Sequence, residues 1–512
     1  MKTAIIIGGG LGGLFTGAIL AKEGLRVTVL EKNATAGGGL QSFHRFGESF
    51  DTGMHVIGGM QPGGNIYRIC EYLGILDQVK IKDVDADCTD CLYFAEDQQT
   101  YQLQKGKDGF INSLSAYFPE ERENLQRYVD AIFAISDSID LFHLRPTTDF
   151  LQVHTDEFLM AADAFVAKYI QNSKLRSIVS YMNPLYGGRQ DETPAFVHAI
   201  ISTLYIQGTS RFVGGSQHFA QLLVSVIEQA GGKVLTHTEV EWVEVNNRHV
   251  EYVRTRQGEI FQGDYFISAI HPCTLLKRMP EKAFPKAYRE RLNQIPNSYS
   301  AFSVYIKLKP DCFPYINHSE YYMTRYDEIW KFGEQHDTWP LGFLLMTPPD
   351  ENQGKYSSKV LITAPMLYDE VKKWEQTTVG HRGEEYETWK AQKAQQLLSH
   401  IEEIHPGFGA CIDRIITASP LTIRDFYGVK DGALSGFSKD YKNIALSQVP
   451  VVTKVDNLLL TGQNNNLHGF CGVPLTAINT AEAILGRNSI LHKINLLAEL
   501  KNRLKISIFL WR

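Results

Sequence analysis

Near its N-terminus the chain alternates apolar runs and glycines in the order strand, loop, helix, strand. An apolar run at residues 4–7 predicts a buried strand, and a second run at 14–23 predicts a helix. Five glycines at positions 8–10, 12 and 13 separate the two runs. Gly24 is expected to end the helix, and residues 27–30 predict another strand. Since the unit is strand, helix, strand, we expect a parallel sheet.

Strand patterns return much later in the sequence, and one of them, 240–254, predicts a hairpin. The other late strands are expected at 233–235, 265–269 and 457–461. We therefore predict an α/β fold whose first domain is discontinuous. That domain is expected to comprise residues 1–75, 206–284 and 411–488.

The two long segments between these pieces predict an inserted α+β domain that binds the substrate, formed by residues 76–205 and 285–410. The first segment is helical in pattern, at 120–142 and 161–181. The second combines strand patterns at 300–307 and 360–364 with a helix at 386–405.

Residues 489–512 predict a basic amphipathic helix. Its apolar positions recur at helical spacing and are interleaved with lysine and arginine. The apolar positions are Ile490, Ile494, Leu497, Leu504, Ile508 and Trp511, and the basic ones are Lys493, Lys501, Arg503, Lys505 and Arg512. The helix is expected either to dock on its own domain or to make a peripheral contact with a membrane surface or a partner.

Composition excludes several functional classes. The 512 residues carry a formal net charge of -6 without a long basic block, which argues against binding to nucleic acid. The N-terminal apolar stretch resembles a secretory signal, but its glycines argue against one. No run of 18 or more apolar residues predicts a spanning helix.

The seven cysteines are scattered and odd in number, which favours a reducing, cytoplasmic location over a disulfide framework. Cys88 and Cys91 have the spacing of a redox or metal pair. No second pair completes a zinc site, so we interpret the spacing as coincidental and expect no metal.

Chemistry is concentrated in the N-terminal glycine loop. Gly8, Gly10 and Gly13 have the spacing of a dinucleotide-binding loop, which combines a tight turn, close approach to a pyrophosphate and close helix-to-strand packing. Glu31 follows the second strand, where a carboxylate accepts hydrogen bonds from a ribose diol. A carboxylate in that position argues against a 2′-phosphate.

Two further segments favour FAD over NAD, because a longer cofactor needs more backbone contact. Gly37 and Gly38 begin a second glycine run after Glu31. An apolar strand at 458–460 leads to Gly462 and then to a helix expected to end near residue 485, with Pro474 in its first turn. The positive end of that helix would stabilise negative charge on a reduced flavin by roughly 0.3 to 2 kcal/mol and so raise its reduction potential.

Nearly end to end, the chain resembles the FAD-dependent carotenoid desaturases, carotenoid isomerases and retinol saturases of the flavin amine oxidase superfamily. The matching motifs are Gly8 to Gly13, Glu31-Lys32, Gly37-Gly38, residues 50–58 around His55, residues 211–216, residues 231–234 with Val240, and Thr461-Gly462-Gln463. The run Asp51-Thr52-Gly53-Met54-His55 is similar to the retinol saturase branch. The resemblance implies a Rossmann-type FAD-binding domain with an inserted substrate domain.

The resemblance also implies particular contacts to FAD. Val240 would contact the adenine, Gly462 the ribityl chain or pyrophosphate, and Gly472 and Val473 the flavin ring. The wider set of cofactor residues is Gly8, Gly10, Gly12, Gly13, Glu31, Lys32, Gly37, Gly38, Val240, Gly462, Gln463, Gly472 and Val473. Many members carry arginine where this chain has Gly39, so that contact does not carry over, and whether Arg45 replaces it stays open.

The function implied is hydride transfer at flavin N5 to or from a carbon-carbon bond of an apolar isoprenoid or polyene, drawn from a membrane surface. Candidates to handle the proton are His55 and His468, because imidazoles titrate near neutral pH. A positioning role is the alternative for both residues, and His198, His218 and His271 are expected to be structural. Tyr186, Tyr205 and Phe212 are expected in aromatic packing or along a substrate tunnel.

The sequence carries a single dinucleotide-binding loop, so electrons are expected to pass to or from a transient NAD(P)H or another partner. Two alternatives remain open at this stage. One is an amine oxidase that produces an imine and hydrogen peroxide. The other is a non-enzymatic lipid carrier like the Rab GDP-dissociation inhibitors.

Overall fold

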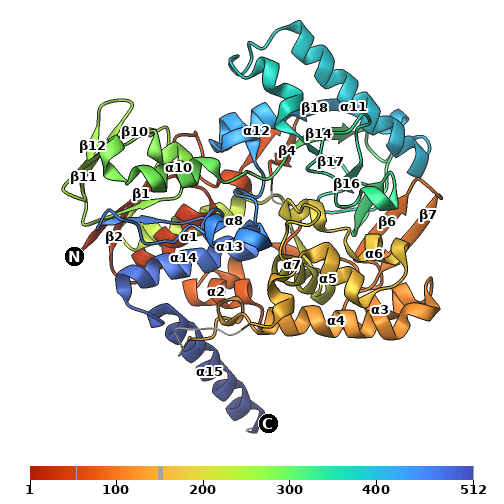
Figure 1. The fold of residues 1–512 in the computed structure, drawn as a ribbon, viewed down its shortest axis with the longest axis horizontal. Helices are drawn as coiled ribbons and strands as arrows, with labels where there is room; N and C mark the ends of the chain where they lie inside the picture. Colours follow the sequence, from red (N-terminus) through yellow and green to blue (C-terminus); the bar gives the residue numbers. More distant parts are fainter. Residues whose placement is uncertain (54, 148–153, 511–512) are drawn as a thin grey trace.

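The computed structural model describes residues 1–53, 55–147 and 154–510, with side chains as far as Lys501. A parallel sheet of five strands, on the left of Figure 1, forms the centre of the first domain in the order β19-β13-β1-β2-β9. Its strands are β1 (Thr3–Ile7), β2 (Arg26–Leu30), β9 (Lys233–Leu235), β13 (Tyr265–Ser268) and β19 (Leu458–Leu460). They come from three distant parts of the chain, as predicted.

The two faces of this sheet are covered by different layers, because successive side chains of a strand point to opposite sides. Ala4 and Ile6 of β1 face the core formed with the helices α1 (Leu11–Lys22), α8 (Gln217–Gln229) and α14 (Gly469–Leu485). Ile5 and Ile7 face the opposite core. There they pack with the antiparallel strands β10 (Val240–Asn246), β11 (His249–Thr255) and β12 (Ile260–Phe261).

The second domain is built on a seven-stranded sheet in the order β18-β14-β17-β16-β15-β6-β7. All its pairs are antiparallel except β15 with β6. Its strands are β6 (Asp90–Phe94), β7 (Gln99–Leu103), β14 (Ser300–Leu308), β15 (Ser319–Met323), β16 (Gly342–Met346), β17 (Lys359–Met366) and β18 (Ile412–Ala418). Both inserted segments therefore contribute to one α+β domain.

Helices cover both faces of this second sheet. A group of five helices lies on the lower right of Figure 1, formed by α3 (Lys107–Ser115), α4 (Arg122–Asp137), α5 (Ala162–Tyr169), α6 (Ser173–Val179) and α7 (Ala195–Gln207). The long helix α11 (Glu384–Ile404) packs on the other face through Leu397 and Ile401.

The predicted boundary at residue 411 is wrong, since β18 belongs to the second domain. Its residues hydrogen-bond along β14, for example Ile415 with Ile306. The chain returns to the first domain only after α12 (Pro420–Tyr427). The strand pattern of 412–418 was present in the sequence, but the partner strand lies about a hundred residues earlier and no local signal identifies it.

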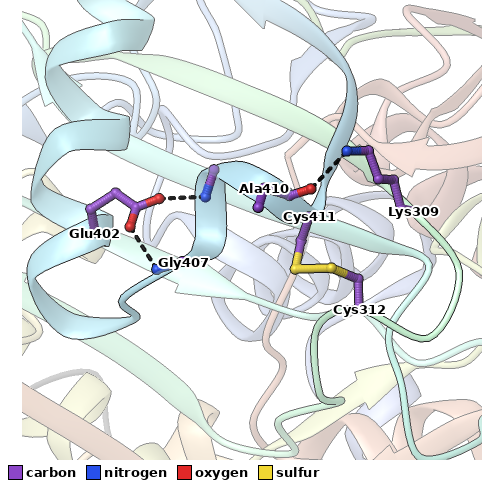
Figure 2. The surroundings of a disulfide bond; sticks show 7 residues. Lys309, Cys312, Glu402, Gly407, Ala410 and Cys411 are labelled. Carbon is purple, nitrogen blue, oxygen red and sulfur yellow. Dashed lines mark hydrogen bonds between the residues drawn. A yellow bond between two sulfur atoms is a disulfide. The ribbon is translucent and has the colours of Figure 1, made fainter.

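A disulfide joins Cys312 and Cys411 in this second domain (Figure 2), which contradicts the expectation that the cysteines are unpaired. Nearby backbone contacts hold the turn that presents Cys411. Lys309 Nζ donates to the carbonyl of Ala410 at 2.8 Å, and the carboxylate of Glu402 accepts from the amide of Gly407 at 2.7 Å. The five remaining cysteines are free thiols.

The remaining elements are smaller. They are the hairpin β3 (Ser42–Arg45) and β4 (Glu48–Asp51), α2 (Asn65–Leu73), the strand pair β5 (Ile81–Asp83) and β8 (Ser210–Phe212), α9 (Pro272–Leu276), α10 (Lys286–Gln294) and α13 (Ile444–Ser447). Within the described ranges, none of the helices has the length and apolar character needed to span a lipid bilayer.

The C-terminal helix α15 (Ser489–Leu510) docks on the first domain by its first half and then projects from the body (Figure 1). Ile490 and Ile494 are buried, and Lys501 pairs with Glu71 of α2 at 2.8 Å. Leu496 and Leu500, on the other side of the helix, are 56% and 49% exposed. The docked interpretation is therefore confirmed for this half, while Trp511 and Arg512 lie outside the described residues.

Candidate functional site

The loop between β1 and α1 is built so tightly that glycine is required. A Cβ on Gly13 would lie 2.0 Å from the carbonyl oxygen of Gly8, and one on Gly12 would lie 2.8 Å from the Cα of Gly462. Gly8 itself has a φ of +101°, a conformation that L side chains rarely adopt. The loop thus brings the start of α1 directly against the end of β19.

The second glycine run packs on the first. The amide of Gly37 donates to the carbonyl of Gly9 at 2.7 Å, and a Cβ on Gly38 would lie 2.9 Å from the Cα of Gly10. The predicted glycines Gly8, Gly10, Gly12, Gly13, Gly37, Gly38 and Gly462 are therefore brought together by the fold. Bare backbone from three segments converges at the N-terminus of α1, where amide dipoles favour an anion.

Glu31 lies at the edge of this glycine cradle and is only 5% exposed. One carboxylate oxygen accepts from the amide of Gly9 and the other from the amide of Asn33, both at 2.8 Å. Two further lone pairs of the carboxylate stay available for hydroxyl donors. Lys32 turns away, since its Nζ donates to the carbonyl of Asp425 in α12 at 2.6 Å and burial lowers its pKa.

The N-terminal part of helix α14 lies next to the glycine cradle at the start of α1. Val473 Cγ1 would lie 3.4 Å from a Cβ on Gly12, so the first turns of α14 and α1 adjoin. A Cβ on Gly472 would overlap Leu467 at 2.4 Å, which explains the glycine. Pro474 is not in the first turn as predicted, because the helix begins at Gly469 and the proline is interior. That position removes the one hydrogen bond an amide at 474 would make to Phe470.

Two predicted cofactor residues lie at the margin of the cradle. Val240 is buried at the start of β10, in the core that also holds Ile5 and Ile7. Gln463 follows Gly462 directly and is half-buried beside Gly436. Arg45 is exposed on β3, with its guanidinium on the carbonyl of His44, so the structure does not bring it to the cradle.

His468 precedes α14 and lies in a narrow apolar pocket. The other residues that line the pocket are Phe142, Val197, Ile200, Ile201, Leu204, Leu467, Cys471 and Gly472. The imidazole hydrogen-bonds the carbonyl of Leu185, and its Nε2 is buried without a hydrogen-bond partner among the described residues. Burial, with a smaller effect of Lys439, lowers the pKa of His468 to about 4.

His55 lies in the loop after β4 and is partly buried. Burial, and then the charge of Arg211, lower its pKa to about 3. The His55 loop is joined to α14, because Cys471 Sγ donates to the carbonyl of Gly58 at 3.1 Å. Burial therefore favours the neutral form of both candidate histidines.

The three histidines expected to be structural have structural contacts. His198 is fully buried, with Nε2 at 2.6 Å from the Tyr128 hydroxyl and Nδ1 at 3.0 Å from the Tyr186 hydroxyl. His271 caps α9, and His218 Nε2 lies 2.9 Å from the carbonyl of Gln78.

One buried polar cluster next to the site was not predicted as functional. Arg211 is fully buried and donates to the carbonyls of Ile316 and Thr347, both at 3.2 Å. Asp90 accepts from the Tyr181 hydroxyl at 3.0 Å, and burial raises its pKa to about 6. Arg211 is part of the motif at 211–216 and could be found from the sequence. Nothing in the sequence around Asp90 indicates that it lies near Arg211.

Comparisons with known proteins agree with this geometry. A family profile described as "Flavin containing amine oxidoreductase" matches residues 11–485. Human all-trans-retinol 13,14-reductase is 27% identical over 94% of this chain and 85% of its own length. A chloroplastic prolycopene isomerase of Arabidopsis thaliana is 24% identical over 90% of this chain and 78% of its own.

Among solved structures, an oxidoreductase from Methanosarcina mazei superposes with a TM-score of 0.64 at 17% identity. The superposition covers 94% of this chain and all of that one. At this identity the likeness concerns the fold.

Proposed function

We propose that this chain, which belongs to the flavin containing amine oxidoreductase family, uses FAD to change a carbon-carbon double bond of an apolar isoprenoid or polyene. The single observation that carries the proposal is the group of apolar side chains at the N-terminus of α14, which surrounds the buried, unpartnered Nε2 of His468 beside the glycine cradle. The relatives named above are a retinol reductase and a prolycopene isomerase.

The residues of the cradle fit FAD. Glycine backbone from three segments leaves room at the N-terminus of α1, where the pyrophosphate would bind. Glu31 would hold the ribose diol with its free lone pairs, and Val240 would lie against the adenine. Gly462, Gln463, Gly472 and Val473 would adjoin the ribityl chain and the ring. Bound FAD supplies hydride transfer at N5.

The side chains around His468 are largely apolar. A polyene offers few hydrogen-bonding groups, so neighbours such as Ile200, Ile201 and Leu204 would suit it. Because Leu185 holds one ring nitrogen of His468, the free Nε2 is the acceptor nitrogen of a neutral imidazole. His468 would then accept a proton or a hydrogen bond from the substrate.

His55 would assist from the other side, through the loop that Cys471 ties to α14. As a neutral imidazole beside the buried Arg211, it would also accept rather than donate a proton at pH 7. We include a transient NAD(P)H or another soluble donor or acceptor in the proposal as the source or sink of electrons.

Peripheral attachment to a membrane from the cytoplasmic side is the second part of the proposal. Leu496 and Leu500 are exposed one helical turn apart, on the side of α15 opposite its buried residues. An apolar substrate would reach the pocket from such a surface. Flotation of the full chain with phosphatidylcholine vesicles containing phosphatidylserine tests this part, with Leu496→Ser/Leu500→Ser expected to reduce binding and the exposed Leu446→Ser as the matched control.

The main test is anaerobic incubation of the protein, loaded in separate samples with oxidised and with reduced FAD, with a panel of carotenoids, retinoids and amines, followed by mass analysis of the products. A product that gains two hydrogens, loses two or keeps its mass separates saturation, desaturation and isomerisation. Amine-dependent bleaching without oxygen, followed by peroxide release once oxygen is admitted, would establish the amine oxidase instead. A protein that binds no FAD would favour the lipid carrier.

A further inference from the structure

A cluster of cysteine, histidine and glutamate side chains lies on the outer face of the seven-stranded sheet, away from the glycine cradle. Cys91 is in β6, and its partner in register on β15 is Glu320. Leu92 and Phe94 of β6 face the helical core, so Cys91 points to the opposite face, the side that α11 covers. Cys88 lies in the segment just before β6.

The two thiols are in contact with each other. Cys88 and Cys91 lie within hydrogen-bonding reach, and the Sγ of Cys88 is also 3.7 Å from the carbonyl oxygen of Asp90. Both side chains are partly exposed, so a small reagent can reach them. The other free cysteines, Cys70, Cys273 and Cys471, are buried.

A chain of charged groups stabilises the thiolate of Cys91. His318 hydrogen-bonds Cys91 and lies 3.7 Å from Glu320, whose other oxygen is 2.6 Å from Nε2 of His405. The neighbouring Cys88 and then the contact with His318 lower the pKa of Cys91, although burial opposes them. Cys91 and Glu320 in turn raise the pKa of His318 to about 9.

These features are those of a reactive thiol pair, in which one cysteine is a stabilised thiolate and its neighbour is a protonated thiol. A metal site is not indicated, because the described part of the chain contains no group of three or more cysteine, histidine or acidic side chains arranged to hold an ion. The sequence alone suggested that the spacing of Cys88 and Cys91 is coincidental. In the structure, this spacing belongs to an accessible pair of thiols with unequal surroundings.

We propose that Cys88 and Cys91 form a thiol-disulfide exchange site that low-molecular-weight disulfides oxidise. The Cys91 thiolate attacks one sulfur of the disulfide, forms a mixed disulfide and releases one thiolate, which takes the proton held by His318. The Cys88 thiol then attacks Cys91 Sγ, and its proton leaves with the second small thiol. The protein loses two electrons and two protons, and the small disulfide is reduced to two thiols.

Oxidised glutathione is the probe, and the FAD-loaded full-length wild-type protein is the sample. After incubation, free thiols are alkylated and the peptides are mapped by mass spectrometry. We expect a peptide joining Cys88 and Cys91 that has lost two hydrogens, restored by reduced glutathione, while Cys70, Cys273 and Cys471 stay alkylated thiols. Recovery of both Cys88 and Cys91 as alkylated thiols at excess oxidised glutathione would overturn the proposal.

Two variants separate the roles of the two sulfurs. Cys88→Ser should accumulate a glutathione adduct on Cys91, since no neighbouring thiol can resolve it, whereas Cys91→Ser should leave Cys88 unmodified. The reverse pattern, or equal modification of both single variants, would contradict the assignment of Cys91 as the attacking thiol. The wild-type peptide map decides the proposal by itself if either variant does not fold.

Discussion

Substitution of Gly12 by alanine tests whether the contact between α1 and the end of β19 shapes the FAD site. The new Cβ would lie 2.8 Å from the Cα of Gly462 and 3.1 Å from its amide nitrogen. Carbon atoms pack best at about 3.5–4.0 Å, so the two backbones must separate by roughly 0.7–1.2 Å. Neither neighbour is a flexible side chain that could move aside.

The expected loss of stability in Gly12→Ala follows from the typical cost of overpacking and the typical gain in helix propensity. Overpacking of this kind costs about 1–3 kcal/mol, whereas alanine in a helix gains about 1 kcal/mol over glycine. We therefore expect Gly12→Ala to lower the free energy of unfolding by up to about 2 kcal/mol. Because the pyrophosphate and the ring would bind on the two sides of this contact, FAD affinity should fall by about tenfold or more, which is 1.4 kcal/mol.

Urea unfolding followed by circular dichroism and FAD titration followed by flavin fluorescence measure the two effects. Gly39→Ala is the matched control, since its Cβ would meet only the Tyr427 hydroxyl at 3.8 Å. Wild-type stability and wild-type FAD affinity in Gly12→Ala would show that this contact does not shape the FAD site. Equal damage from both variants would show that the loop is merely intolerant of side chains.

Three further predictions concern a carboxylate, a disulfide and a buried histidine. Glu31→Gln should weaken FAD binding by about ten- to a hundredfold, because hydrogen bonds to a charged group contribute about 1.5–3 kcal/mol; unchanged affinity in the same titration would argue against a ribose contact. Cys312→Ala/Cys411→Ala opens a loop with a sequence separation of 99 and should lower the free energy of unfolding by up to about 4.7 kcal/mol. This loss should be larger when the variant is compared with untreated wild-type protein than when it is compared with wild-type protein treated with a reductant. Equal losses would count against the prediction. Burial lowers the pKa of His198 from 6.5 to about 4, so as the pH falls the unfolded chain binds a proton at this residue before the folded protein does. The free energy of unfolding should therefore decrease between pH 6.5 and pH 4, by up to about 1.4 kcal/mol per pH unit. His198→Gln should remove that share of the slope in urea titrations at pH 7 and pH 5, and an unchanged slope would contradict the assignment.

Local patterns in the sequence predicted the first domain well, because each of its elements carries its own signal. The glycine spacing, Gly24 and the apolar strands at 4–7 and 265–269 all correspond to elements of the structure. Gly24 has a φ of +90° at the end of α1, the conformation that makes glycine favourable after a helix.

Long-range pairing could not be predicted in the same way. Nothing near Cys312 or Cys411 specifies the other, and β18 is recognisable as a strand without indicating that β14 is its neighbour. Proline is common in the first turn of a helix, yet α14 begins at Gly469 and Pro474 lies inside it.

The candidate site was predicted as a set of motifs, and the structure adds their electrostatics. The sequence names His55 and His468 but cannot show that burial keeps both imidazoles neutral. Nor does it show that Leu185 holds one nitrogen of His468 and leaves the other free, because that carbonyl belongs to a short 3-10 helix far away in the chain.

The most direct test of the central claim is an anaerobic single turnover of the FAD-loaded protein with a polyene that binds, in which the flavin spectrum and the product are measured on the same sample. The account predicts one altered carbon-carbon double bond per flavin, with the polyene gaining or losing two hydrogens as the flavin changes its oxidation state, or a geometric isomer formed only when FAD is bound. Polyenes that stay unchanged at every flavin oxidation state, together with rapid anaerobic bleaching by an amine and release of peroxide once oxygen is admitted, would contradict this function.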